Sequence, residues 1–122
     1  MRRQRDVIAA ATLLALTAGC VAEPLDAALP DDADVLVVAE DIFFAPDRIE
    51  VPAGEVVRLH LRNDGGIVHD LVLDDGWESG DVLPGQGATF ELGPRTTSTV
   101  AWCSIPGHRD AGMELEIVVT DG

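Results

Sequence analysis

Apolar and polar residues alternate in short runs along most of the chain, which is the pattern of half-buried β-strands. The clearest run is 56–62, where Val57, Leu59 and Leu61 fall on one face and charged or polar residues fall on the other. Turns rich in Pro, Gly and Asp separate the runs, and we find no convincing helical period. The pattern predicts an all-β fold, an antiparallel sandwich or barrel of about seven to eight strands. The predicted strands are 35–39, 42–44, 48–51, 56–62, 67–73, 88–92, 96–103 and 114–120.

The first residues have the character of an export signal. Three arginines among residues 2–5 precede an uncharged run, 7–18, which is too short to span a bilayer but suits a secretory signal. The run ends in Leu16-Thr17-Ala18-Gly19-Cys20, which resembles a bacterial lipobox and implies lipidation of Cys20; ordinary cleavage next to small residues is the alternative. We therefore expect a lipoprotein signal peptide at 1–19, a lipidated Cys20 with a flexible acidic tether at 20–34, and a folded domain at 35–122.

The charge of the chain excludes several classes of partner. The sequence has 22 acidic residues against eight arginines and no lysine, and its formal net charge is −14. Such a surface repels phosphate backbones and anionic lipids, so we expect no nucleic-acid binding. The acidity could steer a basic protein partner, and simple solubility is the alternative. At 122 residues the chain has the length of one domain, which we expect to be a monomer.

The segment 103–113 carries the chemistry of a copper site. Cys103, His108 and Met113 follow one another at equal intervals, with four residues between each pair. A thiolate, an imidazole and a thioether together favour copper over the hard cations that prefer carboxylates and water. An electron-transfer copper site uses one Cys, two His and a weak axial Met, so the loop lacks one imidazole.

Two other histidines could supply the missing imidazole. His60 lies between Arg58 and Arg62 on the charged face of its predicted strand, which indicates a surface residue. His69 lies on a largely apolar face just after a glycine-containing loop. A hydrogen-bonded core histidine is the alternative for His69, but the incomplete ligand set favours it as the second imidazole.

Residues 35–122 resemble the cupredoxins, the blue-copper β-sandwich proteins that include plastocyanin and auracyanin. The resemblance is carried by Phe44-Ala45-Pro46 with 49–55, by Val68-His69-Asp70, and by Cys103-x4-His108-x4-Met113. It implies a cupredoxin-like antiparallel Greek-key β-sandwich that holds one type 1 copper ion. It also implies equatorial bonds from His69, Cys103 and His108, with Met113 as the weak axial ligand.

The resemblance assigns further roles around the copper. The residue after the first histidine ties the ligand loops together, and Asp70 stands where relatives often have Asn or Ser. We expect Asp70 to keep this bracing role while its added charge lowers the reduction potential. The edge of His108 is expected to reach solvent and, with Ile105 and Pro106, to dock a redox partner; scattered surface apolar residues are the alternative.

These features predict an electron-transfer protein rather than an enzyme. A binuclear copper centre would need a second cysteine in the loop, and a copper enzyme would need more histidines, of which only His60 is spare. We expect a one-electron carrier on the outer face of the cytoplasmic membrane, serving a partner such as a cytochrome or an oxidase. The alternative is an exported copper-binding or delivery protein, although such proteins tend to be rich in Met or His and this chain has only Met1 and Met113.

Overall fold

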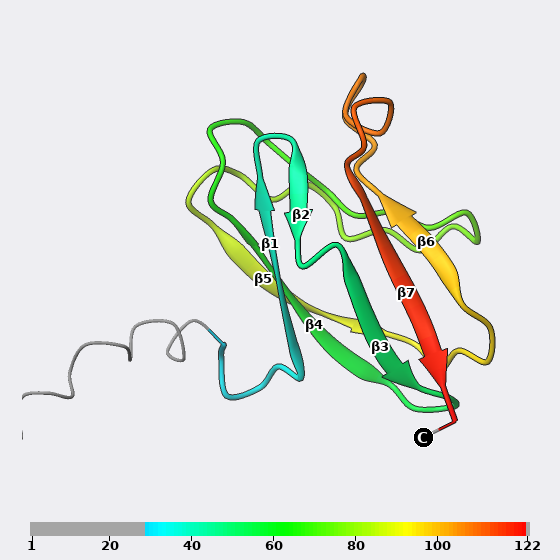
Figure 1. Ribbon diagram of the computed structural model, residues 1–122. Helices are drawn as coiled ribbons and strands as arrows, with labels where there is room; N and C mark the ends of the chain where they lie inside the picture. The colour runs from blue at the N-terminus through cyan, green and yellow to red at the C-terminus, as the bar shows by residue number, and fades with distance from the viewer. Residues whose placement is uncertain (1–28, 122) are drawn as a thin grey trace, which may run out of the picture.

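The computed structural model describes residues 29–121, so the predicted signal peptide, Cys20 and most of the tether lie outside the described residues. Within these described residues, seven strands form two facing sheets (Figure 1). No helix within 29–121 is long and apolar enough to cross a membrane. The strands are β1 (Val35–Glu40), β2 (Phe43–Ala45), β3 (Arg48–Pro52), β4 (Val57–Asn63), β5 (Gly87–Leu92), β6 (Thr99–Trp102) and β7 (Glu114–Thr120).

The fold class predicted from the alternation is confirmed, but the pairing of the strands is not purely antiparallel. One sheet has the order β2-β1-β4-β5 and the other has the order β3-β7-β6. β1 pairs with β4 in parallel, and β3 pairs with β7 in parallel. The expectation of an antiparallel sandwich is wrong on this point, because the chain changes sheets between β2 and β3 and then returns.

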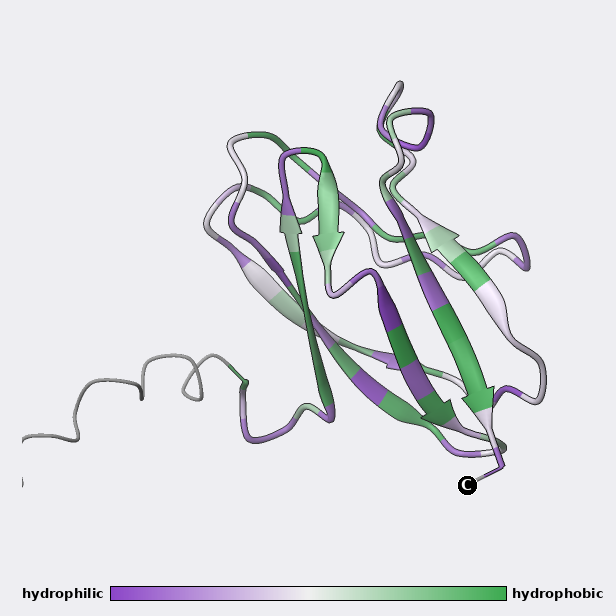
Figure 2. Ribbon diagram, viewed as in Figure 1, coloured by the Kyte–Doolittle hydropathy of each residue, from purple (hydrophilic) through white to green (hydrophobic). Residues whose placement is uncertain are grey.

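The core lies between the two sheets and follows the alternation of the sequence. On β4, Val57, Leu59 and Leu61 are buried while the residues between them are exposed or partly exposed. β7 does the same with Leu115 and Ile117. Figure 2 shows this as green and purple bands that alternate along the strands. Full burial of each large aliphatic side chain contributes about 1.5–3 kcal/mol, so these faces fix the register of both sheets.

The segment 67–73 does not form the predicted strand. It makes only isolated bridges, from His69 to Val82 and from Val72 to Glu78 and Trp102. The three consecutive residues His69, Asp70 and Leu71 are all buried, which a regular pleat cannot provide because it turns neighbouring side chains to opposite faces. The segment is therefore an irregular extended connection, and it runs past the end of β6.

Candidate metal centre

Three side chains from separate parts of the fold meet at one end of the sandwich. Cys103 directly follows β6, His108 lies in the loop between β6 and β7, and His69 comes from the irregular connection after β4. The ligand atoms of these three residues all lie within 4.8 Å of one another. All three residues are buried, His69 and Cys103 fully and His108 to 7% exposure. The second imidazole and the cysteine loop are thus brought together.

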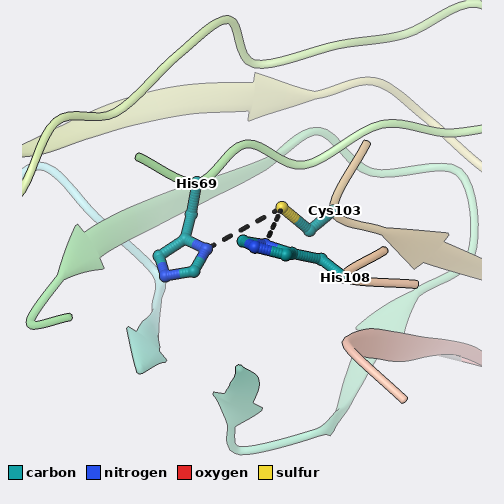
Figure 3. A group of neighbouring side chains, drawn as sticks. All are labelled: His69, Cys103 and His108. Atoms are coloured by element: carbon teal, nitrogen blue, oxygen red, sulfur yellow. Dashed lines mark hydrogen bonds between the residues drawn. The ribbon is translucent and has the colours of Figure 1, made fainter. Parts of the chain in front are cut away.

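In this group the Nδ1 atom of each imidazole ring is directed toward the sulfur. Sγ of Cys103 lies 3.8 Å from Nδ1 of His69 and 3.5 Å from Nδ1 of His108 (Figure 3). The two rings are tilted by 50° with centroids 5.1 Å apart. One thiolate sulfur and two imidazole nitrogens that converge in this way form a donor set that suits copper.

Met113 closes the base of the loop. Its side chain is fully buried, and it stands immediately before β7. Its backbone N–H donates to the carbonyl of His108 at 3.1 Å, and its carbonyl accepts from the N–H of Cys103 at 3.2 Å. Gly112 precedes it at a φ of 100°, in the left-handed region that glycine adopts without strain. With Met113 beside Cys103 and His108, the four residues form the cluster typical of a type 1 copper site.

Burial controls the protonation of Cys103. Desolvation raises the pKa of the Cys103 thiol, although the backbone N–H groups of Asp70 and Ile105 act in the opposite direction. The metal-free thiol therefore keeps its proton at neutral pH. A metal must displace that proton, because the thiolate is the ligand form of cysteine.

Asp70 connects the two segments that carry the ligands. Its carboxylate accepts a hydrogen bond from the backbone N–H of Ser104 at 2.6 Å and another from the Ser104 hydroxyl. The Asp70 residue is only 7% exposed. Since Asp70 follows His69 and Ser104 follows Cys103, this pair of hydrogen bonds holds the two ligand segments together, as expected of a residue in this position.

His60 lies apart from the metal group. Its Nδ1 is 2.9 Å from Oγ1 of Thr89, across the pairing of β4 with β5. It is half-buried rather than a free surface residue as predicted, because the neighbouring strand covers part of the ring. Burial lowers the pKa of His60, which keeps the ring neutral at physiological pH.

Asp41, which the sequence did not single out, touches the metal group. Its Oδ1 lies 3.3 Å from Nε2 of His69. Its carboxylate also accepts from the backbone N–H of Gly66, and that hydrogen bond is the main reason why the pKa of Asp41 is lowered, with His69 adding to the effect. The two residues are 28 positions apart, and an acidic residue in a turn is ordinary, so only the placement of its turn beside the copper loop could have indicated it.

The residues expected to dock a partner are only partly exposed. Ile105 is partly buried, Pro106 is exposed, and His108 keeps 7% of its surface in solvent. Two apolar side chains outside this set are well exposed: Ile67, at 43%, lies two residues before His69, and Leu83, at 51%, follows Val82, which bridges to His69.

Comparisons with known proteins agree with this fold. Residues 7–101 match the family described as "Cupredoxin-like domain", a stretch that ends just before Cys103. Auracyanin from Roseiflexus castenholzii superposes with a TM-score of 0.65 at 14% identity, covering 70% of this chain and 95% of that one. A multicopper oxidase also superposes, with a TM-score of 0.58 at 18% identity, over 75% of this chain and 44% of the oxidase.

A shorter sequence match comes from a protein described as "Copper-resistant cuproprotein CopI" from Pseudomonas aeruginosa. The two are 49% identical over 39 residues. That stretch is 32% of this chain but only 22% of CopI, so most of CopI has no counterpart in the match.

Proposed function

The chain belongs to the cupredoxin-like domain family, and from this premise we propose that it is a type 1 (blue) copper protein that carries one electron at a time. The observation that carries the proposal is the meeting of one sulfur and two imidazole nitrogens within 4.8 Å in a buried site. In this proposal Nδ1 of His69, Nδ1 of His108 and Sγ of Cys103 hold the copper, with Met113 as the weak fourth ligand. The bound copper supplies the one-electron couple.

The rigidity of the site supports electron transfer. Electron transfer has a low barrier when both oxidation states accept nearly the same ligand geometry, so a fixed ligand set favours it. Here Cys103 and Met113 adjoin paired strands, and Asp70 ties Cys103's segment to that of His69. Residues locked in place by packing and surrounding hydrogen bonds hold such a geometry well.

The difference between the two histidines supports His108 as the exit for the electron. His69 is fully buried, whereas His108 keeps 7% exposure beside Ile105 and the exposed Pro106. A redox partner such as a cytochrome or an oxidase would dock on this edge. The lipid anchor at Cys20 belongs to the same proposal and would hold the protein at the outer face of the cytoplasmic membrane.

Catalysis is not part of the proposal. The sequence contains three histidines, and two of them belong to the copper site. The third, His60, is hydrogen-bonded to Thr89 on a different part of the fold. A second, catalytic copper of the kind an oxidase needs would therefore find only this one imidazole in the chain.

A second candidate function is copper binding or delivery without a dedicated role in electron transfer. The match to CopI, whose description refers to copper resistance, favours this alternative. The two functions differ in how firmly the protein keeps its metal. Rapid loss of copper to a chelator together with slow electron exchange would favour delivery, and retention with reversible reduction would favour the carrier.

The proposed copper site is tested by adding Cu(II) to the purified protein and recording visible absorption and electron paramagnetic resonance. We expect an intense thiolate-to-copper band that Cys103→Ser abolishes. The matched control is His60→Ala, which removes a histidine outside the site and should leave the band intact. A colourless wild type with ordinary tetragonal copper parameters would rule out the blue-copper assignment.

The anchor has its own test. Growth of the native host with a labelled fatty acid should label the wild-type protein and leave Cys20→Ser unlabelled. A wild-type protein without label would contradict the proposed lipidation without affecting the copper site.

A further inference from the structure

The turn between β1 and β2 places one carboxylate against the buried copper histidine. Oδ1 of Asp41 lies 3.3 Å from Nε2 of His69. The His69 side chain is fully buried, while the Asp41 side chain is 50% exposed. Asp41 therefore sits between His69 and solvent, and it is the group that meets the outer nitrogen of this ring. The turn and the 103–113 loop lie at the same end of the sandwich, the upper end in Figure 1.

The glycine loop after β4 holds the Asp41 carboxylate in place. The backbone N–H of Gly66 donates to both oxygens of Asp41, at 3.1 and 3.0 Å. A Cβ at Gly65 would overlap Oδ1 of Asp41 and would stand 3.1 Å from Nε2 of His69. The close approach of the carboxylate to the ring thus depends on the missing side chain at Gly65. The outer edge of His69 is therefore surrounded by Asp41, Gly65 and Gly66.

This contact determines which nitrogen of His69 carries the proton. An ionised carboxylate can only accept hydrogen bonds, so Nε2 of His69 must be the donor. A neutral imidazole has one N–H, so Nδ1 then keeps its lone pair. Nδ1 is the nitrogen that faces Sγ of Cys103, at 3.8 Å. The Asp41 contact therefore selects the tautomer in which His69 can bind a metal on the side of the cysteine.

We propose that Asp41 is a positioning residue of the metal centre, whose carboxylate fixes the tautomer and the ring orientation of His69. The inference rests on the proposed copper site. Histidine ligands commonly donate their second N–H to a carboxylate, which also makes the ligating nitrogen more basic. Within residues 29–121 we find no comparable carboxylate on Nε2 of His108. The two copper histidines therefore differ: Nε2 of His69 meets the Asp41 carboxylate, whereas Nε2 of His108 has no such partner among these residues.

The first test needs no metal. In the ¹⁵N-labelled metal-free protein at neutral pH, the nitrogen chemical shifts of His69 should show a single tautomer protonated at Nε2, with slow exchange of that proton. In Asp41→Ala this proton should exchange faster and the Nδ1-protonated tautomer should become populated. An unchanged His69 spectrum in Asp41→Ala would overturn the inference.

The second test follows the metal. Removal of a partner of this kind typically weakens metal binding about 10- to 100-fold, so we expect a loss in that range for Cu(II) in Asp41→Ala. If Cu(II) binding falls tenfold while Cu(I) binding is unchanged, the reduction potential rises by about 59 mV. Asp41→Asn keeps an oxygen that can accept from Nε2 and should lose less affinity than the alanine variant, which also provides a readout if the alanine variant folds poorly.

Asp64→Asn is the matched control, because it removes an acidic residue next to Gly65 that pairs with Arg62 and not with a ligand. It should leave the His69 tautomer and the Cu(II) affinity unchanged. Equal effects of Asp64→Asn and Asp41→Asn would reduce the role of Asp41 to general surface charge and refute the inference. Failure of the wild type to bind copper would refute the proposed function instead, while the tautomer experiment would still decide the role of Asp41.

Discussion

Replacing Asp70 by alanine should destabilise the metal-free protein by separating the two ligand segments. Asp70 is only 7% exposed, and its carboxylate accepts two hydrogen bonds from Ser104. One of them comes from the backbone N–H at 2.6 Å and the other from the hydroxyl. The alanine variant removes the acceptor of both at once.

The size of the effect follows from these two bonds. A hydrogen bond to a charged group contributes about 1.5–3 kcal/mol, so the pair has an upper limit of about 3–6 kcal/mol. Ser104 is exposed, and water can replace part of what its N–H and hydroxyl lose. We therefore expect Asp70→Ala to lower the free energy of unfolding by about 2–3 kcal/mol. Ser104→Ala removes only the hydroxyl bond and should cost about 1–1.5 kcal/mol.

The assay is urea unfolding of the metal-free protein, because bound copper would add its own binding energy to the folded state. Asp70→Ala, Ser104→Ala and the double variant complete a cycle, whose interaction energy should be about 1–1.5 kcal/mol. An Asp70→Ala variant within about 0.5 kcal/mol of the wild type would refute the bracing role, since that is the scatter of an ordinary surface substitution. An interaction energy near zero would show that Ser104 is not its partner.

Four further results are expected. Because burial raises the pKa of Cys103, the thiol must release a proton to bind Cu(II). The apparent affinity for Cu(II) should therefore rise with pH, up to about tenfold between pH 7 and 8. Competition titrations that show the same affinity at both pH values would contradict this. Asp70→Asn removes a negative charge beside the site and should raise the reduction potential in voltammetry, whereas a lower potential would oppose the expected effect of the charge. Leu61→Ala opens a cavity at a fully buried position and should lower the free energy of unfolding in urea by about 2–5 kcal/mol. A loss below about 1 kcal/mol would mean that the surrounding side chains close the cavity. Arg109→Ala removes a guanidinium that lies 3.8 Å from the ring centroid of Trp102. It should lower the free energy of unfolding by only about 0.5–1 kcal/mol, as expected of a surface cation–π pair. A loss as large as that of Leu61→Ala would contradict this interpretation of the contact.

Local sequence was a good guide wherever the structure depends on local geometry. The predicted strand 114–120 coincides with β7, and the alternation of 56–62 recurs in β4, shifted by one residue. The prediction failed at 67–73, where alternating apolar residues suggested a strand. That segment instead buries His69 and Asp70 next to each other, because one faces the copper ligands and the other faces Ser104.

Some residues of the candidate site could likewise be found from the sequence, and others could not. The spacing of Cys103, His108 and Met113 is a property of one loop, so the sequence alone indicated copper. His69 could be chosen over His60 by the face of its predicted strand and by the shortage of imidazoles. Asp41 could not be found in this manner, since its contact with His69 spans 28 positions and joins a turn to a glycine loop.

The sequence by itself therefore determined seven of the eight predicted strands, the all-β class of the fold and the soft donors of the copper loop. These depend on the alternation of burial along a strand and on the chemistry of side chains, both of which can be read from neighbouring residues. Only the tertiary structure decided that two strand pairs run parallel, that Nδ1 of each histidine faces the sulfur, and that Asp41 covers the outer nitrogen of His69. Apart from the contact of His108 with Cys103, which are five residues apart, those features come from contacts between residues 24 or more positions apart. His69 and Cys103, for example, are 34 positions apart, and the folding of the chain into two packed sheets is what brings such segments together.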